Sequence, residues 1–255
     1  MKRNDLLKYG LAALTASTTL LGAGGTAQAQ NPASVEAMAG QGQKPNVVFI
    51  LADNVGYGDL GAYGGGELRG YPTPRSDQLA AEGMRFTQFL VEPACTPSRA
   101  ALLTGQYSIR NGLSLLSPPN SPFQLPDKAY TLGELFKDAG YATGIFGKWH
   151  LGAGPQATPT AHGFDEFYGI PPDTSWSDCL TTPLIVMTHS FPGTEQQLNE
   201  RGAWVESQKA GEPVQRIKPF TSEVRAEIDN DLTDHAIDFM KRQAAAGKPF
   251  FCYLP

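Results

Sequence analysis

The chain of 255 residues has few cysteines, no excess of positive charge and no internal repeat. Its 20 Lys and Arg residues are outnumbered by 25 Asp and Glu residues, so the net charge is −5 and a nucleic-acid-binding protein is a poor match. The three cysteines, Cys95, Cys179 and Cys252, form no C-x-x-C metal pattern. The hydrophobic content of 41% is nevertheless enough for one sizeable core or two small ones.

The first 29 residues match a secretory signal peptide. Basic residues precede a short, mostly apolar run over residues 9–25, and Ala27 and Ala29 form an A-x-A cleavage pattern. The run is too short and too rich in Thr, Ser and Gly to favour a membrane anchor. We therefore expect cleavage after Ala29, a periplasmic or secreted location and no stable membrane insertion.

The remainder of the chain is expected to consist of a flexible lead-in and one folded domain. The lead-in covers residues 30–44 and the domain covers residues 45–255. Without the signal peptide the protein is more acidic, so an anionic substrate needs a local patch of positive charge. The export signal is compatible with a Cys179–Cys252 disulfide, and the alternative is that both cysteines only pack.

Apolar runs alternate with helical patterns along the domain. The expected strands are 46–52, buried on both faces, then 84–91, 141–147 and 248–255; the expected helices are 73–83, 96–105, 130–140 and 231–247. Residues 171–226, rich in Pro, Ser, Thr and charge, are interpreted as a variable excursion with little core. Strands that alternate with helices predict an α/β fold with a mainly parallel sheet and helices on both faces.

Two of the expected helices carry clear end signals. Thr96 is the expected N-cap of the second helix, with Pro97 at its first position and Gly105 past its end. Thr131 and Glu134 form a capping box at the start of the third. These signals place Cys95 directly ahead of a helix N-terminus.

Ligands of parallel sheets bind beyond the carboxyl ends of the strands. Asp53 and Asn54 follow the first strand, Lys148 and His150 follow the third, and the fourth ends at Pro255. Asp-Asn at a strand end suits a hard cation such as Ca²⁺ or Mg²⁺, although the same residues are also common in turns. The glycines at 56, 58 and 61 spell G-x-G-x-x-G, but a carboxylate precedes them and no convincing helix follows, so a dinucleotide site is rejected.

Cys95, Arg99, Lys148 and His150 are the other candidates for chemistry. The helix dipole favours a thiolate or a bound anion at Cys95, and Arg99 lies one turn further on. Lys148 could bind an anion, and His150 could act as acid, base or hydrogen-bond donor. The alternative for each is structural: an inert cysteine, a solvated lysine and a hydrogen-bonded histidine. His162, His189 and His235 are interpreted as structural.

Taken together and in order, these segments resemble the sulfatase family, and its bacterial arylsulfatase-type members in particular. "CTPSRAALLTG" (95–105) matches the signature C-[ST]-P-S-R, which is followed by a small-residue helix and T-G. "PNVVFILADNVGYGDLGAYGGG" (45–66) resembles the opening strand and metal loop of the family. The other matching segments are 72–89 and 140–152, with weaker support from 162–169 and 234–255. The resemblance implies an alkaline-phosphatase-like fold.

The resemblance also implies covalent catalysis at Cys95. In this family a maturation enzyme oxidises the signature cysteine to Cα-formylglycine, which is a gem-diol when hydrated. One hydroxyl attacks the sulfur of a sulfate monoester and expels the alcohol. The second hydroxyl then loses its proton, and sulfate is eliminated as the aldehyde re-forms. The substrate is expected to be a small-molecule or carbohydrate sulfate ester.

The supporting roles implied by the resemblance fall on the strand-end residues. Asp53 and Asn54 match metal ligands, usually for Ca²⁺, and share the cation with the formylglycine at Cys95. Asn54 stands where Asp is commoner, which removes one negative charge from the site.

Three further residues match groups that act on the formylglycine or the sulfate. Arg99 matches an arginine that holds the formylglycine. Lys148 matches a sulfate-binding lysine, and His150 matches a histidine that hydrogen-bonds the second hydroxyl.

Family members continue well past the segment "KPFFCYLP" (248–255). A substrate-contacting histidine, an Asp-Asn pair, a second lysine and a C-terminal subdomain normally follow there. We therefore expect residues 45–255 to be the N-terminal part of a sulfatase catalytic domain, truncated at the C-terminus. The alternatives are a phosphate or phosphonate ester hydrolase of the same superfamily, and an inactive remnant that at most binds an anion or a metal.

Overall fold

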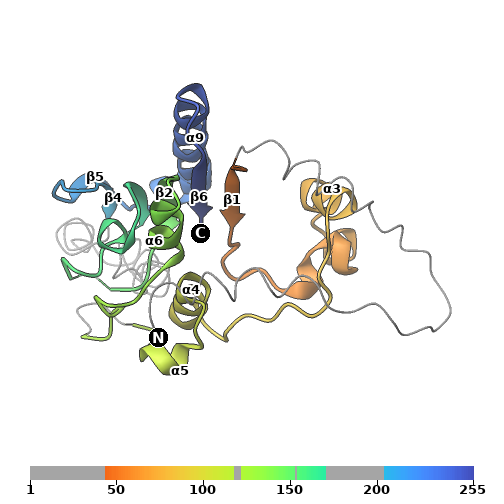
Figure 1. Cartoon of the computed structure of the whole chain (residues 1–255). Helices are drawn as coiled ribbons and strands as arrows, with labels where there is room; N and C mark the ends of the chain where they lie inside the picture. Colours follow the sequence, from red (N-terminus) through yellow and green to blue (C-terminus); the bar gives the residue numbers. More distant parts are fainter. Residues whose placement is uncertain (1–43, 118–121, 153, 171–203) are drawn as a thin grey trace, which may run out of the picture. The chain divides into compact units, whose positions relative to one another are not determined.

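A mixed six-stranded sheet forms the centre of the domain, with the strand order β1-β6-β2-β3-β4-β5 (Figure 1). The computed structural model describes residues 44–117, 122–152, 154–170 and 204–255. The strands are β1 (Val47–Ile50), β2 (Ala142–Lys148), β3 (Glu166–Ile170), β4 (Trp204–Lys209), β5 (Gln215–Pro219) and β6 (Phe250–Leu254). β1, β6, β2 and β3 run parallel, whereas β4 and β5 are antiparallel additions at one edge. The predicted α/β fold with a mainly parallel sheet is confirmed.

Helices cover both faces of this sheet, as predicted. The helix α9 (Ser222–Ala245) packs on β2 and β6 from one side, and α6 (Leu132–Asp138) packs from the other, next to α4 (Cys95–Thr104) (Figure 1). The remaining helices are α3 (Pro74–Glu82) and α5 (Ser108–Asn111), with the 3₁₀ turns η1 (Tyr57–Asp59), η2 (Gly61–Tyr63), η3 (Gly66–Arg69) and η4 (Pro159–His162).

Strand β6 separates two hydrophobic cores because successive side chains point to opposite faces of a sheet. Phe251 and Tyr253 belong to the core on the α4 and α6 side. Phe250 and Cys252 belong to the core on the α9 side. Cys252 is fully buried there, as the packing interpretation predicted, while Cys179 lies outside the described residues.

The prediction that the first strand is buried on both faces is wrong. β1 lies at the edge of the sheet, and Val48 and Ile50 are 47% and 64% exposed. Val47 and Phe49 do pack on the core beneath α4 and α6. The helix α9 reaches β2, β3 and β6, so within the described residues it leaves the outer face of β1 uncovered.

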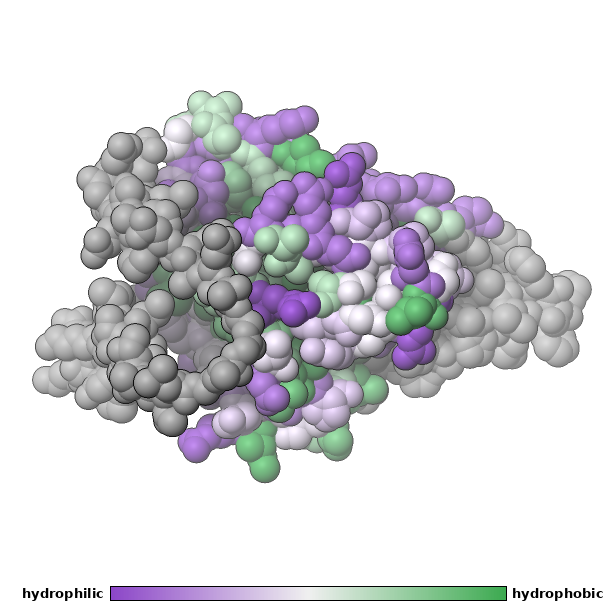
Figure 2. Space-filling view, turned by 90° about the vertical axis from the view of Figure 1, so that its right-hand side faces the viewer, coloured by the Kyte–Doolittle hydropathy of each residue, from purple (hydrophilic) through white to green (hydrophobic). Residues whose placement is uncertain are grey.

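The strand predicted over residues 84–91 is absent from the described structure. Met84 and Phe86 alternate with polar residues and Phe89 follows, but all three are more than half exposed. Alternation forms a strand only where a neighbouring strand supplies hydrogen bonds and a core covers one face. Figure 2 shows hydrophobic residues, in green, at several places on one face of the molecular surface.

The region 171–226 contains more structure than the sequence suggested. β4 and β5 form an antiparallel pair, and Val205 and Phe220 are buried in the core on the α9 side. α9 begins at Ser222 rather than near residue 231, because the Thr221 side chain caps it by accepting a hydrogen bond from the backbone of Val224. Residues 171–203, which include His189, lie outside the described residues.

The helix-end predictions are confirmed for α6 and corrected for α4. Thr131 and Glu134 form the predicted capping box. Gly105 ends α4 with φ +64°, a left-handed conformation that favours glycine. Thr96, however, is not the N-cap: the cap is Ala94, and Cys95 is the first residue of the helix.

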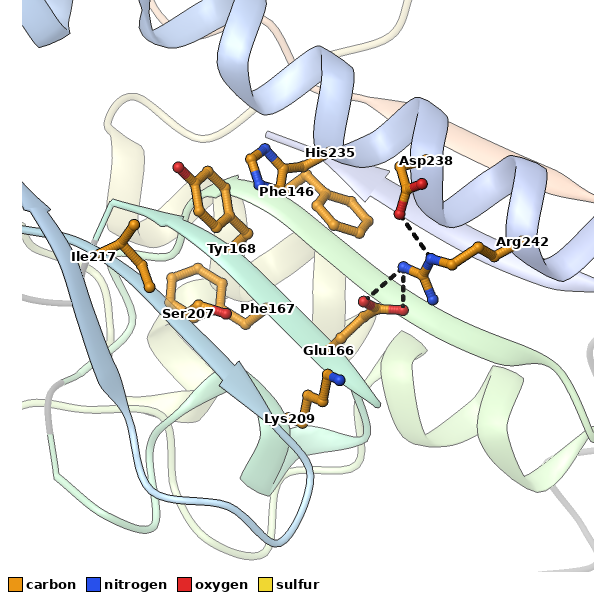
Figure 3. Close-up of a pocket in the computed structure, with 10 residues that line it drawn as sticks. All are labelled: Phe146, Glu166, Phe167, Tyr168, Ser207, Lys209, Ile217, His235, Asp238 and Arg242. Atoms are coloured by element: carbon orange, nitrogen blue, oxygen red, sulfur yellow. Dashed lines mark hydrogen bonds and ion pairs between the residues drawn. The ribbon is translucent and has the colours of Figure 1, made fainter.

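A pocket on the α9 side of the sheet is lined by charged side chains that bind one another (Figure 3). Arg242 of α9 reaches Glu166 of β3 at 2.9 and 3.1 Å and Asp238 at 2.7 Å. The ring of Tyr168 stacks on His235, with the ring centres 3.6 Å apart, and its hydroxyl donates to Asp231 at 2.7 Å. His235 therefore has a structural role, as interpreted from the sequence: its ring stacks on Tyr168 rather than only contacting solvent.

Strands β2 and β3 approach so closely that Gly169 has no room for a side chain. A Cβ there would lie 2.0 Å from the carbonyl oxygen of Gly147. We expect Gly169→Ala to lower the free energy of unfolding by about 3 kcal/mol, the upper range for overpacking, in a denaturant titration. Gly211→Ala is the matched control, because it adds a methyl group in open space at φ +85° and costs about 1 kcal/mol through backbone strain alone. Equal losses in the two variants would contradict the steric explanation.

No helix in the described part of the chain combines the length and apolar character needed to cross a membrane. The proposed signal peptide and nearly all of the lead-in lie in residues 1–43, outside the described residues.

Candidate functional site

The carboxyl ends of three parallel strands meet at one edge of the sheet. The backbone of Leu51, just after β1, donates to Leu254 O of β6 at 2.9 Å, and the backbone of Lys148 in β2 donates to Pro255 O at 3.4 Å. This arrangement brings the residues after β1 next to the end of β2. The candidate residues therefore lie together at the carboxyl ends of the strands, as the sequence predicted.

Asp53 lies at the centre of the site. Its carboxylate accepts a hydrogen bond from Lys148 Nζ at 2.9 Å and forms a 3.5 Å ion pair with Arg99 Nη2. The thiol of Cys95 donates to the other carboxylate oxygen, with Sγ and Oδ1 3.5 Å apart. Lys148 Nζ also lies 3.6 Å from Cys95 Sγ. Four residues from three separate segments of the sequence thus form one cluster.

Helix α4 positions Cys95 and Arg99 in this cluster. Cys95 is half-buried at the first helical position, and Arg99 follows one turn later on the buried side, 1% exposed. Arg99 Nη1 donates to the backbone oxygen of Lys148 at 2.9 Å, so α4 is tied directly to the end of β2. Lys148 itself is only 5% exposed. Two buried cations therefore face a single carboxylate.

His150 and Asn54 have left-handed backbone conformations, with φ +56° and φ +60°. They are the only non-glycine residues with positive φ in the described part of the chain, and both line the same cavity. Such conformations are costly and are often retained at functional sites. His150 is 1% exposed; its Nε2 lies 3.2 Å from Ser117 O, and its backbone oxygen accepts from the Thr96 hydroxyl at 3.2 Å.

The two cations determine which groups of the site are ionised. Burial raises the pKa of Asp53, but the hydrogen bond and charge of Lys148 and the charge of Arg99 outweigh it, so the pKa is lowered overall. Burial also raises the pKa of the Cys95 thiol, and the charges of Lys148 and Arg99 only partly offset this effect. Of the alternatives for Cys95, the raised pKa favours a protonated thiol over a thiolate in the unmodified residue.

The cluster forms the floor of an open cavity of about 460 Å³. Its charged and titratable lining consists of Asp53, Glu92, Cys95, Arg99, Lys148 and His150. Val55, Val91 and Leu116 line it as well, and each is exposed. The cavity thus combines a charged floor with exposed aliphatic side chains, and a molecule with an anionic group and a less polar body fits this combination.

The donors for a cation are present in part. Asp53 supplies carboxylate oxygens and the exposed Asn54 supplies an amide oxygen, which are ligand types that Ca²⁺ and Mg²⁺ take. Within the described residues, no group of three or more His, Cys, Asp or Glu side chains gathers there. Ca²⁺ takes six to eight oxygen ligands. Asp53 and Asn54 therefore fit one side of a cation site.

Several supporting residues were missed or misread in the sequence. The Thr96 hydroxyl connects His150 O with the backbone nitrogen of Ser117, which donates to it at 3.2 Å. Glu92 accepts from the backbone and hydroxyl of Ser108 and fixes the segment that precedes Cys95. A hydroxyl residue at the start of a helix, such as Thr96, indicates a local cap in the sequence. It does not indicate a contact between distant segments.

Comparison with known proteins places this cluster in context. A family model described as Sulfatase matches residues 45–255. The chain is 37% identical over 224 residues to N-acetylgalactosamine-6-sulfatase of Canis lupus familiaris, which covers 84% of this chain and 40% of that protein. It is 52% identical over 131 residues to arylsulfatase A of Bos taurus, covering 50% of this chain and 25% of that protein.

A solved structure is similar over the same region. The sulfatase PsFucS1 from Pseudoalteromonas sp. superposes with a TM-score of 0.69 at 34% identity, covering 86% of this chain and 45% of that one. The chain thus spans less than half the length of these relatives. The mainly parallel sheet with helices on both faces is the alkaline-phosphatase-like fold of such enzymes. Because the family model covers nearly all of the described residues, the chain belongs to the sulfatase family.

Proposed function

We propose that the protein is a formylglycine-dependent sulfatase that hydrolyses a sulfate monoester to an alcohol and sulfate. The observation that carries this proposal is the position of Cys95, with Lys148 3.6 Å and Asp53 3.5 Å from its sulfur. Arg99 adds a second buried cation, so two cations and one carboxylate lie in direct contact at Cys95. An ester that carries a sulfate anion is attracted to such a site, and charge that develops on its oxygens is stabilised there.

The neutral state of Cys95 supports a role other than that of a thiol nucleophile. Thiol enzymes lower the pKa of their cysteine, whereas burial raises the pKa of Cys95. Oxidation of Cys95 to formylglycine by a maturation enzyme would supply the oxygen nucleophile of a hydrated aldehyde. In this role the residue needs its position at the start of α4 rather than an acidic thiol.

The other side chains of the cluster then have separate tasks. Arg99, fixed on Lys148 O, holds the group at position 95. Lys148 binds a sulfate oxygen and keeps Asp53 ionised. His150, whose strained backbone fixes its place in the cavity, hydrogen-bonds the hydroxyl that must lose a proton. Asp53 and Asn54 would hold Ca²⁺ (or Mg²⁺), which adds positive charge beside the sulfate oxygens.

The substrate is proposed to be a carbohydrate sulfate ester or a small-molecule sulfate ester. The name of the N-acetylgalactosamine-6-sulfatase relative supports the carbohydrate class. The signal-peptide pattern over residues 1–29 supports a periplasmic or secreted location, where extracellular sulfated carbohydrates are encountered.

The proposal predicts a preference for sulfate over phosphate esters. The complete protein, co-produced with a formylglycine-generating enzyme, is assayed with 4-nitrophenyl sulfate and 4-nitrophenyl phosphate at several Ca²⁺ concentrations. We expect kcat/KM to be at least about ten-fold higher for the sulfate, because the leaving groups are identical and a sulfatase site discriminates through the charge and shape of the transferred group. Faster turnover of the phosphate would favour a phosphate ester hydrolase, and absence of turnover with both would favour an inactive remnant.

A further inference from the structure

Tyr253 places a hydroxyl group inside an apolar core. It lies on β6, opposite Phe49 of β1 and Ile145 of β2, and is 1% exposed. Its ring packs edge-on against Phe49 at 6.0 Å and stacks with Phe164 at 6.4 Å. Phenylalanine would make the same ring contacts without burying a polar atom, which costs free energy unless it is hydrogen-bonded. The hydroxyl therefore requires an explanation other than packing.

Tyr253 points from β6 into the core beneath α4, which also contains Ala100, the residue after Arg99 on that helix. Burial raises the pKa of Tyr253 to about 12, although the charge and hydrogen bonding of Arg99 lower it. The hydroxyl and Arg99 Nε are both buried, and in the described residues neither forms a well-aligned hydrogen bond. Two buried polar groups on the same side of the sheet, neither with a partner of its own in the described residues, are complementary: the guanidinium can donate and the phenol oxygen can accept.

The two terminal nitrogens of Arg99 already have partners. Nη1 donates to Lys148 O at 2.9 Å, and Nη2 pairs with Asp53 at 3.5 Å. A third contact at Nε would define the plane of the guanidinium completely. A neutral phenol orients the guanidinium without neutralising it, so Arg99 keeps its charge for Asp53 and for the group at position 95. A carboxylate at position 253 would compete with Asp53 for that charge.

We propose that Tyr253 is a positioning residue of the active site: its hydroxyl accepts a hydrogen bond from Arg99 and fixes the guanidinium beside Asp53 and position 95. The effect on catalysis rests on the proposed sulfatase function, whereas the contact itself does not. Tyr253 touches neither the substrate nor the reacting group and acts only through Arg99.

The test of the catalytic effect is Tyr253→Phe, which removes one oxygen atom and keeps the ring. We expect kcat for 4-nitrophenyl sulfate to fall roughly ten-fold with little change in KM, because a misplaced group at the reacting centre slows the chemical step rather than substrate binding. The matched control is Tyr168→Phe, which also removes a buried tyrosine hydroxyl, on the α9 side of the sheet (Figure 3). Equal kcat values for Tyr253→Phe and the wild type would overturn the proposal.

A double-mutant cycle in thermal unfolding tests the contact without any assay of activity. Tyr253→Phe and Arg99→Gln are measured singly and together, and we expect non-additive shifts of the unfolding midpoint, since contacting residues couple. The cycle of Tyr168→Phe with Arg99→Gln is expected to be additive. Additive shifts in the Tyr253 cycle would overturn the proposal. A wild type that hydrolyses no ester would refute the sulfatase function, and the cycle would then decide alone whether Tyr253 positions Arg99.

Discussion

Replacing Cys95 by alanine is expected to abolish hydrolysis of 4-nitrophenyl sulfate, with kcat falling by at least about 10⁴-fold, as for other nucleophile deletions. The substitution removes the only atom of the cluster that can become the nucleophile, while helix propensity at this position improves slightly. Asp53, Lys148 and Arg99 stay in place, so the variant should retain the cavity and its charge. Loss of activity in a folded protein is therefore the expected outcome.

Cys252→Ala is the matched control for this experiment. This substitution also removes the sulfur atom of a cysteine. Cys252, however, is buried on the α9 side of the sheet, away from the cavity. Activity per folded molecule should be unchanged in this variant, even though the loss of packing lowers its stability. Mass spectrometry of the peptide that contains Cys95 completes the test. An active protein with an unmodified thiol at Cys95 would refute the formylglycine nucleophile.

Asp53→Ala is expected to lower the free energy of unfolding by about 3 kcal/mol in the absence of added cations, the lower end for a broken buried ion pair. The substitution leaves Arg99 and Lys148, 1% and 5% exposed, close together without their shared counter-ion. The lower end applies because the Asp53 side chain is 30% exposed, so water can reach part of the gap. Chemical denaturation of the wild type and the variant measures this loss.

The same variant tests the proposed cation site. Ca²⁺ should raise the unfolding midpoint of the wild type and leave that of Asp53→Ala unchanged, because a ligand stabilises only the state that binds it. Asp238→Ala is the control: its carboxylate pairs with Arg242 on the exposed side of α9 and contributes less than about 1 kcal/mol. Equal stability losses in the two variants would contradict the central role of Asp53, and an equal response to Ca²⁺ would contradict the cation site.

The sequence was sufficient to predict a mainly parallel sheet that contains β1, β2 and β6, although not β3, and the gathering of the site residues. Those predictions depend on local patterns: a capping box at Thr131 and Glu134, a β-branched run before Asp53, and strand ends that must share one edge. The structure brings Asp53, Arg99, Cys95 and Lys148 within hydrogen-bond or ion-pair distance. Their catalytic roles remain predictions.

The features that the sequence did not predict depend on distant parts of the chain. The segment 84–91 alternates like a strand but has no pairing partner among the described residues. The β4–β5 pair was missed because polar and charged residues together dominate its sequence, although Val205 anchors it in the core. Thr96 and Tyr253 carry ordinary local signals, a helix cap and a strand residue. Only the fold shows that the Thr96 hydroxyl bonds to His150 O and that Tyr253 lies on the side of the sheet that carries Arg99.

The ion pairs around Asp53 also have a consequence for the order of folding. Lys148 is 95 residues from Asp53 in the sequence, Cys95 is 42 residues away, and Arg99 is 49 residues from Lys148. Contacts with such separations form only after the intervening loops have closed, which slows folding relative to local helix formation. The reaction centre should therefore assemble in a late step, together with the docking of β1, β6 and β2. For the same reason, hydrogen exchange of the Ser98 amide, which donates to Ala94 O at 3.0 Å, should report the global opening of the sheet rather than local fraying.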